Sequence, residues 1–180
     1  MILMHLCCGP CSLYPIKVLR ARRISFKGFF YNPNLHPYRE FRERIKALET
    51  VQKIKELEII WDKGYGLRDF LEKTFEFKDK PEKRCEICYT WRLKATVKKA
   101  LEIKAEAFTT TLLYSIYQKH ELIKEIAEDL SNHYKIPFFY EDFRKGFKEG
   151  LEEAKKLGLY LQGYCGCIFS EEERYYKKLK

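Results

Sequence analysis

The sequence lacks long apolar runs, internal repeats and biased tracts. Its longest apolar stretches are far shorter than the roughly 20 residues that a membrane-spanning helix needs. No period of about 20 to 50 residues recurs, and no glycine-rich or serine-rich linker divides the chain. The first residues, "MILMHLCCGP", lack the basic start and long apolar core of a secretory signal. We therefore expect a soluble cytoplasmic protein with one catalytic domain over residues 1–180.

Acidic residues are fewer than basic ones. The chain has 26 aspartates and glutamates against 35 lysines and arginines, which gives a formal net charge of +9. Such an excess favours a polyanionic partner, with nucleic acid first, because each phosphate contact releases condensed counterions. Charge alone leaves open a surface that is simply basic or adapted to heat.

Short apolar segments alternate with helical patterns along the chain. The strand-like segments are 2–6, 24–31, 57–62, 105–111 and 137–140. Three apolar stripes at helical spacing separate them: Phe41, Ile45, Leu48 and Val51; Leu93, Val97, Ala100 and Leu101; and Ile123, Ile126, Ala127 and Leu130. A last helix is expected to start at Ser170, with Glu173 closing a capping box. The alternation predicts an α/β protein with a three-layer Rossmann-like (HUP-like) parallel sheet and helices on both faces.

Three cysteines occupy the loop after the first predicted strand, in "HLCCGPCS". In an open parallel sheet, ligands bind beyond the carboxyl ends of the strands, so this loop is a functional position. Gly9 and Pro10 are expected to form a tight turn. Cys11 would then lie in the first turn of the next helix, near amides that favour a thiolate.

Two further cysteines, Cys85 and Cys88, have the Cys-x-x-Cys spacing of metal ligands and are expected just before a helix. With Cys7 and Cys8 they would provide four thiolates from two loops at one edge of the sheet. The spacing alone leaves both a structural zinc and an iron-sulfur cluster open. The number of cysteines in the two loops exceeds what a closed zinc site requires, which favours the cluster. A third interpretation takes Cys8 and Cys11 as a lone thioredoxin-type pair, which leaves the other thiols unexplained.

The last two cysteines, Cys165 and Cys167, are separated only by Gly166. A disulfide between them would close a very small, strained ring, and strained disulfides are easily reduced. The pair therefore suits a reversible two-electron store, with two idle thiols as the alternative.

With these three cysteine groups, the sequence resembles the epoxyqueuosine reductases of the cobalamin-independent QueH type. The matching segments are "LCCGPCS", "FYNPNLHPYREFRERI", "RCEICYTWRL", "FTTTLLYSIYQKHELI", "EDFRKGF" and "YCGCIFS". The resemblance implies reduction of the epoxide of epoxyqueuosine, at the wobble position of a tRNA anticodon, to the alkene of queuosine. It makes Cys7, Cys8, Cys85 and Cys88 the ligands of a 4Fe-4S cluster, and Cys165 and Cys167 the redox-active pair.

The remaining thiol, Cys11, is a candidate ligand of a second, mononuclear iron, with Asp62 at the end of the third strand completing the site. Iron can receive the epoxide oxygen as it gains negative charge. The electron donor is not identified by the sequence. A zinc-bearing RNA-binding module and a thiol-disulfide oxidoreductase are the alternative functions.

Polar and aromatic residues after the second and fourth strands are candidates for substrate binding. They are Tyr31, Asn32, Asn34, His36, Thr110, Thr111, Ser115, Gln118 and Arg92. Candidates for phosphate contacts are Arg20, Arg22, Arg23, Arg42, Arg44, Arg92, Arg144 and Lys145. His5 and His133 are expected to have structural roles.

Overall fold

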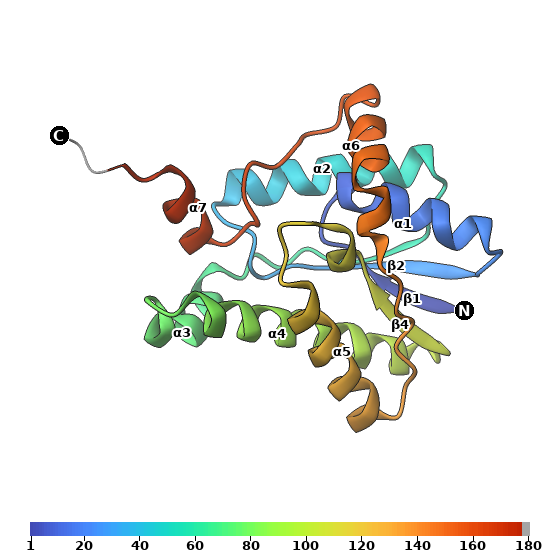
Figure 1. Cartoon of the computed structure of the whole chain (residues 1–180), viewed down its shortest axis with the longest axis horizontal. Coiled ribbons are helices and arrows are strands. Elements are labelled where there is room, and N and C mark those ends of the chain that lie inside the picture. Colours follow the sequence, from blue (N-terminus) through green and yellow to red (C-terminus); the bar gives the residue numbers. More distant parts are fainter. Residues whose placement is uncertain (178–180) are drawn as a thin grey trace.

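The computed structural model, which describes residues 1–177, has a four-stranded parallel sheet with strand order β3-β2-β1-β4 (Figure 1). The strands are β1 (Ile2–His5), β2 (Phe26–Tyr31), β3 (Ile59–Asp62) and β4 (Ala107–Thr110). All three pairings are parallel. The predicted α/β Rossmann-like class is therefore confirmed.

Helices cover both faces of this sheet. The helices are α1 (Gly9–Ala21), α2 (Tyr38–Ile54), α3 (Leu67–Thr74), α4 (Pro81–Glu102), α5 (His120–Tyr134), α6 (Phe147–Lys156) and α7 (Ile168–Tyr175). Short 3-10 turns lie at η1 (Phe75–Phe77), η2 (Thr111–Tyr114) and η3 (Phe143–Gly146). Figure 1 shows α1, α2 and α6 on one face and α3, α4 and α5 on the other.

The core consists of two apolar clusters, one on each side of the sheet. Successive strand residues point to opposite faces, so Leu3 and Phe29 pack toward α4 and α5, whereas Met4 and Phe30 pack toward α1 and α2. All four side chains are buried. This explains why the strands appear as continuous apolar runs in the sequence.

The strand order reverses beside β1, because β2 lies on one side of it and β4 on the other. The carboxyl ends of these strands therefore border the crevice in which α/β proteins bind ligands. The loop after β1 carries Cys7 and Cys8, Cys11 lies in the first turn of α1, and α7 lies beyond the same edge of the sheet (Figure 1).

Three local expectations were wrong. Segment 137–140 is not a strand, because only Phe138 pairs with the sheet, through an isolated parallel bridge to Phe108. The last helix begins at Ile168 with Cys167 as its N-cap, so Ser170 lies inside it and forms no capping box. Gly9 and Pro10 are the first residues of α1 rather than a separate turn.

The cysteines Cys85 and Cys88 also differ from their expected place. They lie within α4, which begins four residues earlier at Pro81, and do not precede the helix. Their spacing puts the two side chains on neighbouring positions of one helical face. No helix in residues 1–177 has the length and apolarity to cross a membrane.

Candidate active site

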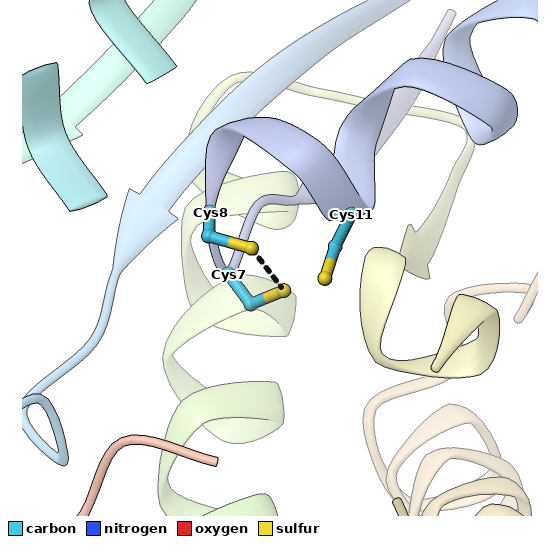
Figure 2. Close-up of side chains that lie close together, drawn as sticks. All are labelled: Cys7, Cys8 and Cys11. Carbon is cyan, nitrogen blue, oxygen red and sulfur yellow. Dashed lines mark hydrogen bonds between the residues drawn. The ribbon is translucent and has the colours of Figure 1, made fainter. Parts of the chain in front are cut away.

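Three thiols converge where β1 passes into α1. The Sγ atoms of Cys7, Cys8 and Cys11 all lie within 4.8 Å of one another, and all three residues are buried (Figure 2). The Cys7 and Cys8 sulfurs are 3.7 Å apart. Two sulfurs bound to one ion lie at most about 4.6 Å apart, because each metal-sulfur bond is about 2.3 Å long. This thiol triad could therefore bind a metal.

The local chain path brings these side chains together. β1 ends at His5, and Cys8 is the extended N-cap residue of α1. Cys7 and Cys8 therefore lie outside the strand, where adjacent side chains would have to point to opposite faces. The helix starts against the backbone of α2: a Cβ atom on Gly9 would lie 2.6 Å from the carbonyl oxygen of Ala47. Only glycine permits this approach, which fixes the position of Cys11 one half-turn later.

Hydrogen bonds distinguish the three thiols. The Thr111 hydroxyl donates to Cys7 Sγ at 3.3 Å and accepts from the Cys7 amide at 3.0 Å. Hydrogen bonds from Cys11 and Cys8 hold the pKa of the Cys7 thiol well below its usual range. Burial raises the pKa of Cys8 to about 12, and the bond to Cys7 raises that of Cys11. Cys7 is thus the thiolate of the triad.

Helix α4 contributes the second predicted cysteine pair. Cys88 is buried, Cys85 is partly buried, and burial raises the pKa of both thiols, that of Cys88 to about 11. Neither thiol belongs to the group of sulfurs that all lie within 4.8 Å of one another, which contains Cys11 in their place. Cys85 packs against the same apolar cluster that contains the triad.

The side chain of Arg92 connects α4, through Asn32, to the loop between β1 and α1. It is buried, its Nη1 lies 3.9 Å from Cys88 Sγ, and its Nη2 donates to Asn32 Oδ1 at 2.6 Å. Asn32 in turn donates to the carbonyl of Leu6 at 2.8 Å, next to the triad. The positive charge of Arg92 contributes to the lowered pKa of Cys7 and opposes the rise that burial causes in the pKa of Cys88.

Residues 160–167, the C-terminal strap, bring Cys165 and Cys167 to the same region. The Gln162 amide donates to Cys8 Sγ at 3.0 Å and to Cys11 Sγ at 3.4 Å. Its Oε1 is buried without a partner among residues 1–177. The strap therefore contacts the triad directly three residues before the second thiol pair.

Arg44 in α2 anchors this strap. Its guanidinium donates to the carbonyls of Tyr164 at 2.9 Å and Cys165 at 3.0 Å, and it forms a buried ion pair with Glu40 at 2.7 Å. The Tyr160 hydroxyl also donates to Glu40. A planar guanidinium can serve these acceptors at once, so Arg44 fixes the backbone beside Cys165.

The loop before α2 holds the backbone between and after Cys165 and Cys167. The His36 amide donates to the carbonyl of Gly166 at 2.7 Å, and the Ile168 amide donates to His36 Nδ1 at 3.3 Å. Gly166 has φ of +131° and a Cβ there would lie 2.6 Å from Leu35. The position requires glycine for its backbone conformation and for space.

The pKa values of the two strap thiols, Cys165 and Cys167, are shifted in opposite directions. Both lie near the Ser170 hydroxyl, Cys165 Sγ at 3.0 Å and Cys167 Sγ at 3.4 Å. A hydrogen bond from Cys167 lowers the pKa of Cys165 to about 5, whereas the same contact and burial raise the pKa of Cys167. Cys165 is thus a ready thiolate with a neighbouring protonated thiol.

A cavity of about 730 Å³ connects the two thiol groups. Cys7 and Cys11 line it from the triad, and Cys165 lines it from the strap. Arg44 and Arg92 add two buried cations to its wall. The size is typical of small-molecule sites.

The structure separates the predicted substrate-binding residues into two groups. Arg92, Ser115 and Gln118 line the cavity. The others do not line it: Tyr31, Asn32, Asn34, His36, Thr110 and Thr111. Several of these instead have structural partners, such as Thr110, which bonds His5 and caps η2, and His36, whose amide donates to the carbonyl of Gly166 in the strap.

Several other expected residues have identifiable roles. The exposed Asp62 carboxylate accepts from the Gly64 amide at 3.1 Å and is not grouped with the triad, so its role as a metal ligand stays a prediction. Arg44 and Arg92, two of the candidates for phosphate contacts, are buried. Arg22 and Arg144 pair with Glu141 and Asp142.

Gln162 and Glu40 are site residues that the sequence analysis missed, whereas Tyr117, which follows Ser115 after the fourth strand, was a candidate for contacts to substrate hydroxyls. Gln162 and Tyr117 line the cavity, and Glu40 holds Arg44. No residue pattern marks Gln162 and Glu40, because they meet the other groups only through the tertiary fold.

Known proteins match this chain over almost its whole length. The family model described as "Epoxyqueuosine reductase QueH" matches residues 2–173. A protein of that name from Dehalococcoides mccartyi is 32% identical over 176 residues, covering 98% of this chain and 95% of the relative. Another from Thermotoga maritima is 36% identical over 183 residues, covering 96% and 91%.

Proposed function

Because the chain belongs to the epoxyqueuosine reductase QueH family, we propose that it reduces the epoxide of epoxyqueuosine in tRNA to the alkene of queuosine. The observation that carries this proposal is the cavity lined by both thiol groups, the triad and the strap pair. A substrate there contacts a metal-binding set and a dithiol at once. The chain is thus proposed to act as a single catalytic domain over residues 1–180.

The electrons come from the strap pair in this proposal. Removal of the epoxide oxygen takes two electrons and two protons and releases water. Cys165 and Cys167 supply both electrons when they form a disulfide. The Cys167 thiol supplies one proton and solvent supplies the other, because Cys165 is already a thiolate. An external donor must reduce that disulfide again. The lowered pKa of Cys165 supports this role, because the thiolate is the reactive form.

We propose that Cys7, Cys8, Cys85 and Cys88 hold a 4Fe-4S cluster and that Cys11 holds a second iron. An all-thiol donor set suits iron-sulfur chemistry, and the triad's burial protects such a centre from solvent. When bound, the centre would supply one-electron transfer and a Lewis-acidic iron. Arg92 and Gln162 would donate hydrogen bonds to the sulfurs, as they do to Cys88 and Cys8.

Substrate polar groups are proposed to meet Arg92, Ser115 and Gln118 on the cavity wall. Gln118 is oriented by the Tyr89 hydroxyl, which donates to its Oε1 at 2.7 Å. Its amide nitrogen can then donate to a hydroxyl of the substrate. The net charge of +9 supports tRNA as the partner, and the proposed site of the reaction is the cytoplasm.

Metal analysis combined with an activity assay tests the proposal. Protein purified without oxygen should contain iron and sulfide and should convert epoxyqueuosine in an RNA stem-loop when given a reductant. Cys85→Ser should lose the brown colour, and Cys167→Ser should keep colour and metal but lose turnover. A colourless zinc protein that binds RNA without turnover would establish the zinc module instead, and metal-free reduction of protein disulfides would establish a thiol-disulfide oxidoreductase.

A further inference from the structure

The size of the cavity decides which part of an RNA can enter it. Its volume of about 730 Å³ suits one nucleoside, and its thiols, Cys7 and Cys11, lie on its wall. The wobble nucleotide must therefore leave the anticodon stack to react, as in enzymes that flip a base into a pocket. Its two neighbours in the RNA then remain at the mouth of the cavity.

Tyr117 lies on this cavity and is unusually exposed. Its side chain is 79% exposed, more than any other large hydrophobic residue in the described part of the chain. Two contacts nevertheless orient it: its amide donates to Ser115 Oγ at 3.3 Å, and its ring meets Phe147 nearly perpendicularly at 5.8 Å. Phe147 is itself packed on Tyr114 at 5.4 Å. The tyrosine is thus oriented and still offers an open π-face.

The rest of the cavity lining suits a nucleic acid better than an apolar partner. Leu161 adds a partly exposed apolar side chain, and Arg174 adds a guanidinium with no ion-pair partner in residues 1–177. Proteins that bind single-stranded RNA combine aromatic stacking faces with cationic side chains in this way. The chain's positive net charge is consistent with such a partner.

We propose that Tyr117 is a stacking platform for the nucleobase beside the wobble nucleotide, so that it holds the anticodon loop open at the cavity. The inference rests on the proposed function, since it assumes an RNA substrate. Every nucleobase has a π-face, so the stacking supports binding without selecting a base. The phenol hydroxyl is not needed for this role.

Equilibrium binding tests the proposal without turnover. The probe is a labelled anticodon stem-loop RNA, titrated by fluorescence anisotropy with full-length wild type, Tyr117→Ala, Tyr117→Phe and Phe75→Ala. Phe75 is the matched control, because it is 60% exposed, lies near Lys78 and does not line the cavity. We expect Tyr117→Ala to weaken binding about 5- to 100-fold, the range for loss of one stacked base, while Tyr117→Phe and Phe75→Ala stay within about twofold.

A second RNA identifies the stacked base. Two stem-loops each lack the base on one side of the wobble position. In the stem-loop that lacks the base stacked on Tyr117, Tyr117→Ala should cause no further loss of binding affinity. Binding of Tyr117→Ala within about twofold of wild type, or an equal loss in Tyr117→Phe, would overturn the proposal. Failure of the wild type to bind the stem-loop would instead count against the proposed function itself.

Discussion

Arg44 Nη1 donates a hydrogen bond to the main-chain carbonyl of Cys165 at 3.0 Å, which joins helix α2 to the thiol pair at the other end of the chain. The same guanidinium bonds the carbonyl of Tyr164 and the buried carboxylate of Glu40. One side chain thus couples the packing of the domain to the position of the strap.

Arg44→Met, alone and combined with Glu40→Gln, should show whether Arg44 affects catalysis independently of its effect on the stability of the fold. The single change leaves Glu40 charged and buried, which we expect to cost about 3 to 5 kcal/mol in free energy of unfolding. In the double variant Arg44→Met, Glu40→Gln, most of that loss should be recovered, because no unpaired charge remains. The kcat for RNA reduction should stay at least about tenfold below wild type in both, because the carbonyls beside Cys165 lose their donor. Recovery of kcat in the double variant, measured beside denaturant unfolding, would contradict the positioning role.

Alkylation should distinguish the two thiols of the strap. The pKa of Cys165 is about 5, so its thiolate persists as pH falls from about 8 to 6 and is half protonated near pH 5. Cys167, with a raised pKa, should react at least about 100-fold more slowly with iodoacetamide at pH 7. Peptide mapping by mass spectrometry gives both rates in reduced protein.

The control for this measurement is Cys165→Ser. The variant loses the Cys165 sulfur, whose hydrogen bond with Cys167 is the largest cause of the raised pKa of Cys167. Alkylation of Cys167 should therefore become faster in the variant. A Cys165 rate that is half-maximal at pH 8 or above would show an ordinary thiol and contradict the assignment.

The sequence predicted those features that depend on local pattern. Strands β1 to β4 and the helices with regular apolar stripes are confirmed, because burial on both faces leaves a strong periodic signal. The enzyme family is confirmed as well, since its cysteine groups are local motifs. Segment 137–140 was wrong as a strand because only Phe138 reaches the sheet.

Features that depend on distant contacts could not be predicted. Arg44 was a candidate for phosphate contact, and its role in holding the strap could not be predicted because the carbonyls that it binds follow it by more than a hundred residues. Cys11 joins Cys7 and Cys8 because Gly9 lets α1 begin directly after Cys8 against α2. A helix start is among the least certain features of a sequence, and here it determines which thiols meet.

Thr111→Val should weaken metal binding without disturbing the fold. The hydroxyl bonds both the Cys7 sulfur and the Cys7 amide, so it orients a proposed ligand. Loss of such a supporting hydrogen bond reduces metal affinity by about 10- to 100-fold. Iron retained after challenge with a chelator, measured at equal protein concentration, tests this expectation.

Thr109→Val is the matched control for Thr111→Val. Thr109 is also fully buried, but its hydroxyl has no hydrogen-bond partner among residues 1–177. Its replacement therefore removes no bond, and stability and iron content should equal or exceed those of wild type. Equal iron retention in the two variants would show that the Thr111 hydroxyl does not support the metal site.

His5 should make the protein less stable in mild acid. Burial lowers its pKa from about 6.5 to about 3, and the neutral ring bonds Thr110 at 2.9 Å and the Tyr31 carbonyl at 3.2 Å. Below pH 6.5 the unfolded chain binds a proton at this histidine that the folded chain excludes. The free energy of unfolding therefore falls as pH decreases from about 6.5 to 3, by about 1.4 kcal/mol per pH unit from this residue. In His5→Gln the slope over this range should be shallower by that amount. Urea unfolding between about pH 7 and 5 measures the slopes, and identical slopes in wild type and His5→Gln would show that His5 takes up a proton in the folded state.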